Sequence, residues 1–318
     1  MAAETVRDPH DLRKLLAAAT AVGAVHQHGD GRATYLQGLS AAAVNDDRRM
    51  QPVNQVRVPK TTGIVILDGG RVYFDRSAGT ATYRTLNDRD FYLGTAVGDA
   101  ASADDSLVVN MNQEPYYEIE LSGNSRLSQG AWVCEKTNGL GVTLLPGGGA
   151  QLAFHAAAQA AQAALYSERK VDLASNPILE MRVALFDKGD NAALDINFGL
   201  ANGSHATDFQ SVTEQVTFHL NGNALDLFAE SDDGTIDVAE VDTTFNCVDD
   251  EWFECWIDCR DLTDIQMYVN GVLRLGSNVF TLEDATGPVF PIFHMEKTSD
   301  DTVADFRIDL ARLRTAEQ

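Results

Sequence analysis

The chain has 318 residues, 44% of them hydrophobic, and its 47 acidic and 24 basic residues give a formal net charge of −23 at pH 7. This length favours two domains, with enough apolar residues for a core in each. The sequence contains neither a run of 18 apolar residues nor a basic N-terminal region followed by an apolar stretch, so we expect no membrane span and no signal peptide.

The acidic excess lies in the second half. Residues 1–170 carry 18 acids and 16 bases, a net charge of −2, whereas residues 171–318 carry 29 acids and 8 bases, a net charge of −21. An acidic surface repels phosphate, which argues against nucleic-acid binding. The simple interpretation is a solvated surface that resists aggregation. The functional one is that the neutral half docks onto a partner, using the bases Arg48, Arg49, Arg57 and Lys60.

Residues 1–40 predict a helix and an extended arm. Asp8 can cap the helix, Pro9 suits its first turn, and Leu12, Leu15 and Leu16 would form its apolar stripe. We expect the helix to end near Thr20. Residues 21–60 show no clear periodicity and predict an extended arm.

Residues 41–115 predict a small β-module. Five short segments are rich in apolar and β-branched residues, and a turn at 68–70 would join the first two. These segments are 63–67, 71–75, 79–84, 91–99 and 106–112. Short strands at this spacing favour a small β-barrel or tulip-like sheet.

Residues 116–318 alternate strands and turns. In 265–269 apolar and polar residues alternate, and Asn270-Gly271 supplies the positive φ angles of a type I′ hairpin. The preceding strand, 252–259, also alternates, with Phe253, Cys255, Ile257 and Cys259 on one face. Further strands are predicted at 178–186, 193–200, 215–220, 225–230 and 235–239.

Two motifs of this half resemble a known fold. A strand with an early Trp252, followed by the Ile265–Val272 hairpin, resembles the late strands of concanavalin-like and laminin-G-like jelly rolls. The segment 293–301, His-x-Glu-Lys-Thr-Ser-x-Asp after Phe293, resembles the closing strand of jelly rolls in phage structural proteins. The resemblance implies a lectin-like antiparallel sandwich, a fold that serves sugar binding, lyases, glycosidases and scaffolds.

A second resemblance concerns the small module. Gly94–Ala101, followed by Asp104-Asp105 and Leu107–Val109, resembles the core of small phage capsid decoration ("cement") proteins. Asp104-Asp105 stands where those proteins usually have Gly-Glu. The resemblance implies a module that docks on a capsid.

Residues 150–166 support two interpretations. Ala156–Leu165 favours a helix by composition, whereas Gln151–His155 alternates as a strand does. The lectin-like template places two strands and a loop here, and we adopt that prediction.

Two groups could bind metal ions. The first comprises His26, His28 and Asp30, where a further ligand at a fixed distance is missing and a polar loop is the simpler explanation. The second comprises Asp232, Asp233 and Asp237, which could bind Ca²⁺ but lack the alternating order of a calcium loop. A hairpin turn at Asp-Gly explains the second group more simply.

Two pairs could act on sugars. Glu118 and Glu120 share one face of a strand, as some glycosidase acids do, but no third acid or aromatic platform accompanies them. Trp252 and Trp256 also share a face and could stack on sugar rings, although packing within the sheet explains them better. The four cysteines, Cys134, Cys247, Cys255 and Cys259, fit no zinc pattern or disulfide framework and predict buried, reduced thiols.

Taken together, the sequence predicts a mainly β protein. It comprises an N-terminal helix and arm (1–40), a small β-barrel or tulip-like module docking on the capsid (41–115) and a concanavalin-like jelly roll (116–318). The resemblance implies a structural, non-enzymatic phage capsid decoration protein that is assembled in the host cytoplasm, binds the major capsid protein on the capsid exterior and forms a homo-oligomer such as a trimer. We expect no catalytic, cofactor or metal residues, and no nucleic-acid or membrane partner. The alternative is a carbohydrate-binding or host-adhesion module with a glycan ligand, and a weaker one is a sandwich-fold glycosidase or polysaccharide lyase.

Overall fold

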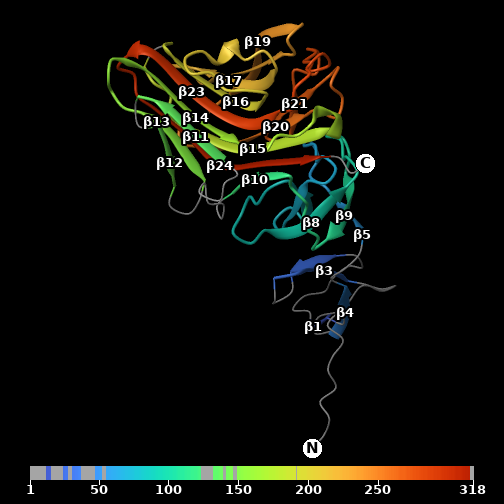
Figure 1. Ribbon diagram of the computed structural model, residues 1–318. Helices are drawn as coiled ribbons and strands as arrows, with labels where there is room; N and C mark the ends of the chain where they lie inside the picture. The colour runs from blue at the N-terminus through green and yellow to red at the C-terminus, as the bar shows by residue number, and fades with distance from the viewer. Residues whose placement is uncertain are drawn as a thin grey trace, which may run out of the picture. The chain divides into compact units, whose positions relative to one another are not determined.

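The chain forms two compact units, Met1–Tyr116 and Tyr117–Gln318, in the computed structural model (Figure 1). The residues that the structure describes are 12–15, 24–27, 31–36, 47–51, 55–122, 132–138, 141–145, 149–190 and 192–315. Every regular element among them is a β-strand or a short 3₁₀ turn, and the strands pair antiparallel, which confirms the mainly β prediction. The described residues contain no helix that is both long and apolar enough to cross a membrane.

The first unit contains two sheets. A five-stranded sheet has the order β5-β9-β8-β6-β7, and a four-stranded sheet has the order β1-β4-β3-β2. The strands are β1 (Leu12–Leu15), β2 (Val25–Gln27), β3 (Ala33–Leu36), β4 (Asp47–Gln51), β5 (Gln55–Pro59), β6 (Arg71–Asp75), β7 (Thr80–Thr82), β8 (Phe91–Val97) and β9 (Ser106–Met111).

The two sheets of this unit share one apolar core. Ala33 of β3 belongs to the same buried cluster as Val72, Leu93 and Val109 of the five-stranded sheet. The side chain of Asn112 fixes this arrangement, because it accepts from the backbone N–H of Ala33 at 2.8 Å and donates to its carbonyl at 2.9 Å. Strands β2 and β3 therefore contribute residues to the core of the unit.

This arrangement corrects two predictions. Leu12–Leu15 is not helical but forms β1, which pairs with β4, and the rest of the predicted helix lies outside the described residues. The predicted arm, 21–60, contains strands β2 to β5. Pairing between strands distant in sequence satisfies the backbone groups here and overrides the local helix signals.

Two further predictions in this unit are wrong. The segment 63–67 is not a strand, since only Ile66 makes an isolated bridge, to Ala100, and β6 pairs with β7 and β8 instead. Lys60 is not a docking base. It is buried, and its ammonium group donates to the carbonyls of Thr61 and Ile64 at 2.8 and 2.7 Å, which holds this segment in an irregular course.

The second unit is a sandwich of two sheets. The eight-stranded sheet follows the order β12-β13-β24-β15-β20-β21-β22, with β10 also paired to β24. Its strands are β10 (Ile119–Leu121), β12 (Gly141–Leu144), β13 (Ala150–Phe154), β15 (Pro177–Asp187), β20 (Trp252–Asp258), β21 (Gln266–Val269), β22 (Val272–Arg274) and β24 (Ala304–Thr315).

The seven-stranded sheet follows the order β11-β14-β23-β16-β17-β18-β19. Its strands are β11 (Trp132–Thr137), β14 (Gln159–Ser167), β16 (Leu194–Ala201), β17 (Gln215–Asn221), β18 (Asp226–Asp232), β19 (Asp237–Asn246) and β23 (Phe290–Asp300). The aromatic rings of Phe198 and Phe306, one from each sheet, lie 5.2 Å apart in the core. Alternate residues of both sheets fill this core, as the strand periodicity predicted.

The local predictions for the sandwich are confirmed. Asn270 and Gly271 have φ angles of 51° and 74° and join β21 to β22. Residues 150–166 form strands β13 and β14 rather than a helix, because Ala161, Ala163 and Leu165 alternate into the core while β14 pairs on both sides. All four cysteines have free thiols, but Cys134 on the edge strand β11 is exposed rather than buried.

Gly199 in β16 tests how closely the strands of the sandwich pack. A Cβ atom built there would lie 2.3 Å from the carbonyl oxygen of Val216 and 2.8 Å from the Cα of Thr217. We expect Gly199→Ala to lower the free energy of unfolding by about 1–3 kcal/mol, because backbone must shift. Urea denaturation followed by tryptophan fluorescence measures this. The matched control is Gly203→Ala, where a Cβ meets nothing within 4 Å; an equal loss there would contradict the explanation.

Candidate functional site

Alternate residues of the seven-stranded sheet point away from the sandwich core and form a polar face. We define this face by Gln162 (β14), Asp195 and Asn197 (β16), His219 (β17), Glu230 (β18), and His294 and Glu296 (β23). The register places His294, Asn197 and His219 opposite one another in one row, and Gln162, Glu296 and Asp195 in the next. Side chains directly opposite on neighbouring strands lie about 5 Å apart at Cβ. The sheet thus gathers residues that are up to 134 positions apart (162 to 296).

A covering loop, residues 202–214, crosses the polar face between β16 and β17. Its base is closed by the backbone hydrogen bond from Asn202 to the carbonyl of Glu214, at 3.0 Å. Its middle is the 3₁₀ turn Phe209–Ser211. Phe209 and Val212 pack with apolar residues at one end of the face, namely Ala201, Phe290 and Ile292. This apolar contact anchors the loop on the sheet.

Polar contacts hold the rest of the covering loop. The carbonyl of His205 bonds to Nε2 of His294 at 2.9 Å, and the backbone N–H of Phe209 donates to Oε2 of Glu296 at 3.1 Å. The amide of Gln210 donates to both carboxylate oxygens of Glu230, at 3.1 and 3.0 Å. These contacts bury most of the polar face under the loop.

His219 lies at the centre of a network of carboxylates. It is only 2% exposed, and its Nε2 lies 3.1 Å from Oδ1 of Asp195 while its Nδ1 lies 3.4 Å from Glu240 and 3.7 Å from Glu230. Burial alone would lower the pKa of His219, but hydrogen bonds and charge from Asp195 and Glu230 outweigh it and raise that pKa to about 10. His219 is therefore an imidazolium at neutral pH.

The neighbouring row contains a carboxyl group with a raised pKa, that of Glu296. Burial, together with the negative charges of Asp195 and Asp208, raises the pKa of Glu296 to about 7. Burial lowers the pKa of His294 to about 4, so this imidazole is neutral at physiological pH. The face thus holds a neutral imidazole and a half-protonated carboxyl group beside one imidazolium.

Several buried polar atoms of the face have no hydrogen-bond partner among the described residues. They are Nε2 of Gln162, both Oδ1 and Nδ2 of Asn197, and Nδ1 of His294. The three side chains are 2% exposed or less. A buried polar group without a partner costs about 1–3 kcal/mol, and such groups concentrate at functional sites. These atoms offer both donors and acceptors to a ligand that reaches the face.

Charge is distributed unequally between the two sheets. Residues 189–246, which include β16 to β19 of the seven-stranded sheet, contain 11 acids and no lysine or arginine. On the eight-stranded sheet, by contrast, acids pair with arginines. These ion pairs are Arg182–Asp309, Arg260–Asp258, Arg307–Asp305, Arg312–Glu120 and Arg314–Glu180. The acidic excess of the sequence is therefore concentrated on the side of the polar face.

The carboxyl groups of Asp195 and Glu296 lie directly opposite each other on neighbouring strands, and paired carboxyl groups also occur in acid–base catalysis. However, Glu296 is only 8% exposed and its Oε2 accepts from the covering loop. This carboxyl group therefore lies beneath the covering loop rather than on open surface.

The residues that the sequence predicted as candidates do not belong to this face. His26 lies in β2, while His28 and Asp30 lie outside the described residues. The carboxylates of the hairpin turn are bonded locally: Asp232 accepts from the backbone of Gly234, and Asp233 accepts from Thr235 and Ile236. A turn explains these acids, as the sequence analysis favoured.

The two pairs considered for sugar chemistry lie elsewhere in the sandwich. Glu118 forms an ion pair with Arg169, and Glu120 forms one with Arg312 at 3.1 Å. Trp256 is buried beside Tyr268, with ring centroids 6.0 Å apart, and Trp252 packs edge-on against Phe186. Trp256 therefore packs within the sandwich, while Trp252 is half-buried with the guanidinium of Arg182 over its ring.

Sequence reasoning identified the strands of the polar face but none of its residues as functional. The signal was present as polar residues alternating with core residues, as in Asp195 and Asn197 between Leu194, Ile196 and Phe198. Such alternation also describes an ordinary solvated face. Only the strand order and the covering loop distinguish the two.

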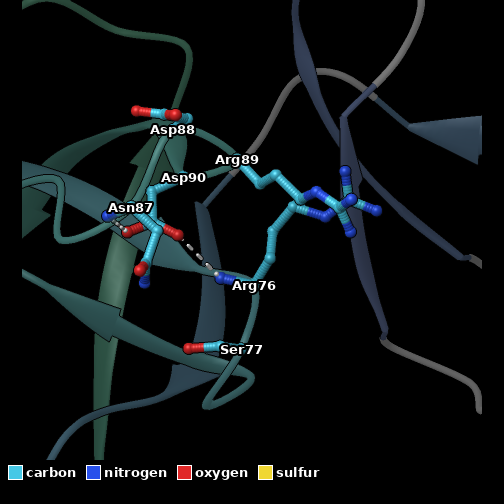
Figure 2. Close-up of a pocket in the computed structure, with 6 residues that line it drawn as sticks. All are labelled: Arg76, Ser77, Asn87, Asp88, Arg89 and Asp90. Atoms are coloured by element: carbon cyan, nitrogen blue, oxygen red, sulfur yellow. Dashed lines mark hydrogen bonds between the residues drawn. The ribbon is translucent and has the colours of Figure 1, made fainter.

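A pocket of about 480 Å³ in the first unit is a second candidate. Its lining residues are Arg76, Ser77, Asn87, Asp88, Arg89 and Asp90. Asp90 accepts from the backbone of Arg76, Leu86 and Asn87 and so joins the two segments, while the side chains of Arg76 and Arg89 extend in the same direction (Figure 2). All the lining residues except Asp90 are exposed, so this pocket removes little water from a ligand, and the polar face is the stronger candidate.

Comparisons with known proteins describe the fold only. No protein family and no curated protein matches the sequence. Among solved structures, the chain is similar to the carbohydrate recognition domain of Emp47p (12% identity, 62% of this chain, 95% of that chain, TM-score 0.46). It is also similar to an endo-acting O-glycanase of the human gut microbiota (10% identity, 64% of this chain, 100% of that chain, TM-score 0.47). A third similar structure is a carbohydrate esterase of the Shiga toxin-encoding bacteriophage phi24B (12% identity, 64% of this chain, 99% of that chain, TM-score 0.43). At such identities the similarity concerns the course of the chain and not its activity.

The His219 network makes the stability of the sandwich pH-dependent. Since the pKa of His219 is raised from 6.5 to about 10 on folding, its contribution is fully present below pH 6.5 and is lost as the pH rises towards 10. We expect the free energy of unfolding to fall across this range and to fall much less in His219→Gln. Urea denaturation at several pH values, followed by the tryptophans, all of which lie in the second unit, measures it.

The control for this experiment is His155→Gln, which removes an exposed imidazole and should leave the pH dependence unchanged. A wild-type stability that is flat or rising between pH 6.5 and 10 would refute the assignment of a buried imidazolium.

Proposed function

We propose that the sandwich is a carbohydrate-binding module whose ligand lies on the polar face. The observation that carries this proposal is the group of unpartnered buried atoms of Gln162, Asn197 and His294. Amide and neutral imidazole groups pair well with hydroxyl groups, because each hydroxyl both donates and accepts a hydrogen bond. A ligand with several hydroxyl groups at fixed spacing would satisfy all three side chains.

The ligand would enter beside the covering loop. Asp195 has a side chain that is 33% exposed and Glu240 one that is 37% exposed, so this margin of the face is open to solvent. Gln162 lies in the same row across the strands as Asp195, and Asn197 lies in the neighbouring row. The covering loop would then exclude water from the bound ligand, which strengthens each polar contact.

A stability measurement tests whether Asn197 is held for binding. In the ligand-free protein we expect Asn197→Leu to raise the free energy of unfolding by about 1 kcal/mol, because it replaces an unpartnered amide with an apolar group of similar shape. Urea denaturation measures the change. Asn221→Leu is the control, since its amide donates to Glu240 at 3.0 Å and its loss should not stabilise. A destabilised Asn197→Leu variant would mean that the amide is satisfied.

A binding experiment tests the function itself. We expect the full chain to bind at least one glycan of a mixed array, and Asn197→Leu and Gln162→Leu to weaken that binding about tenfold or more in calorimetry, because each loses a hydrogen bond in a dry site. Gln266→Leu, on the other sheet, should bind as the wild type does. Failure to bind any glycan, or binding that both variants retain, would refute the proposal.

The interpretation as a phage capsid decoration protein stays a prediction. It rests on the resemblances in the sequence and on the charge split, and carbohydrate binding is compatible with it, since a module on a capsid exterior can contact surface glycans. The expected contacts with a major capsid protein and the expected trimer belong to this prediction. Stoichiometric copurification with intact particles would support it, and complete absence from particles would contradict it.

A further inference from the structure

We propose that the ligand of the polar face carries a positive charge and is an amino sugar. This inference rests on the proposed carbohydrate binding and specifies its ligand. Two independent observations carry it: the unpartnered amide and imidazole groups, which call for hydroxyls, and an excess of carboxylates around them, which calls for a cation.

The carboxylates come from five strands and from the covering loop. They are Glu135 (β11), Asp195 (β16), Glu230 (β18), Glu240 (β19), Glu296 (β23) and Asp208 of the loop. The cationic partner that the structure gives them is His219, which contacts three of the six. The others are bonded to neutral donors, as Glu135 is to the hydroxyls of Tyr166 and Ser204 at 2.5 and 3.0 Å. In the described part of the chain, no lysine or arginine forms an ion pair with any of the six.

This excess is specific to one side of the sandwich. Five acids of the eight-stranded sheet form ion pairs with arginines, for example Asp309 with Arg182 at 2.9 Å and Asp305 with Arg307 at 2.8 Å. If the acids served only to keep the surface solvated, we would expect the same lack of ion pairs on both sheets. Carboxylates held close together without cations repel one another, and a bound cation would relieve that repulsion.

Asp195 is the group best placed to receive the charge. Its Oδ1 is bonded to His219, and its Oδ2 has no partner among the described residues. Its side chain is partly exposed and lies directly opposite Glu296, which lies opposite Gln162. An ammonium group at this margin would contact Asp195 while ring hydroxyls of the same sugar reach the unpartnered amides. Charge-assisted hydrogen bonds of this kind are about twice as strong as neutral ones.

The same charges exclude anionic glycans. A uronate, sialate or sulfate group near Asp195 would meet several carboxylates within the distance over which charges act at physiological salt. A simple polyamine would satisfy the charge but not the buried amides, because it has no acceptor for Nε2 of Gln162 or Nδ2 of Asn197. Both features of the site are met together only by a sugar that carries an amine.

Calorimetry with three oligosaccharides and one polyamine tests the inference on the full chain. The ligands are a glucosamine tetramer, the same tetramer N-acetylated, a galacturonate tetramer, and spermidine, each at low and high salt. We expect the glucosamine tetramer to bind about tenfold tighter than its N-acetylated form, with the difference shrinking at high salt. Galacturonate and spermidine should bind at least about a hundredfold more weakly than the glucosamine tetramer.

The variant Asp195→Asn keeps the shape of the side chain and should remove the preference for the amine while retaining binding of the N-acetylated tetramer. Glu283→Gln, an exposed acid outside the face, should change neither. Equal or tighter binding of the N-acetylated form, or binding of galacturonate, would overturn the amino-sugar inference and leave carbohydrate binding standing. If spermidine bound as tightly as the glucosamine tetramer, charge alone would explain the binding and the inference would also fall. Absence of binding to every glycan would refute both proposals together.

Discussion

The contact between the buried imidazolium of His219 and its surrounding carboxylates is the interaction on which the polar face depends. Asp195, Glu230 and Glu240 come from three strands, and the imidazolium between them offsets their mutual repulsion. Glu230 in turn holds Gln210, and through it the covering loop. A buried ion network contributes little net stability, yet breaking one member is costly. The network is thus better understood as fixing one arrangement of loop and sheet.

Most of the sandwich could be predicted from the sequence, because its signals are local. Alternating residues mark a strand wherever it pairs, and Asn270-Gly271 marks a hairpin through its own backbone preferences. In 150–166 composition favoured a helix, and only the fold template gave the right answer. The helix prediction for Leu12–Leu15 was wrong because this segment pairs with β4, more than 30 residues away, and its own residues do not indicate that pairing.

The residues of the candidate site could not be predicted from local sequence patterns, for a related reason. Its residues are spread from Gln162 to Glu296, and each one looks like an ordinary solvent-facing residue of a strand. Two facts distinguish them: the strand order, which makes β14, β23, β16 and β17 neighbours, and the loop 202–214, which buries them. The sequence does show that acidic residues dominate this region, since residues 189–259 contain no lysine or arginine. That asymmetry indicated a distinct surface but not its centre.

The same asymmetry limits how copies of this chain can associate. Two copies brought together through the covering loops and open margins of their polar faces would bring carboxylates of like charge close to one another, where a screening length of about 8 Å at physiological salt leaves much of their repulsion in place. Self-association through these faces is therefore disfavoured, unlike the dimers that many sandwich proteins build by stacking sheets. Association through the eight-stranded sheet, whose arginines and acids can exchange partners across an interface, carries no such penalty. Such an association would leave the open margin of the polar face, at Asp195 and Glu240, accessible to solvent.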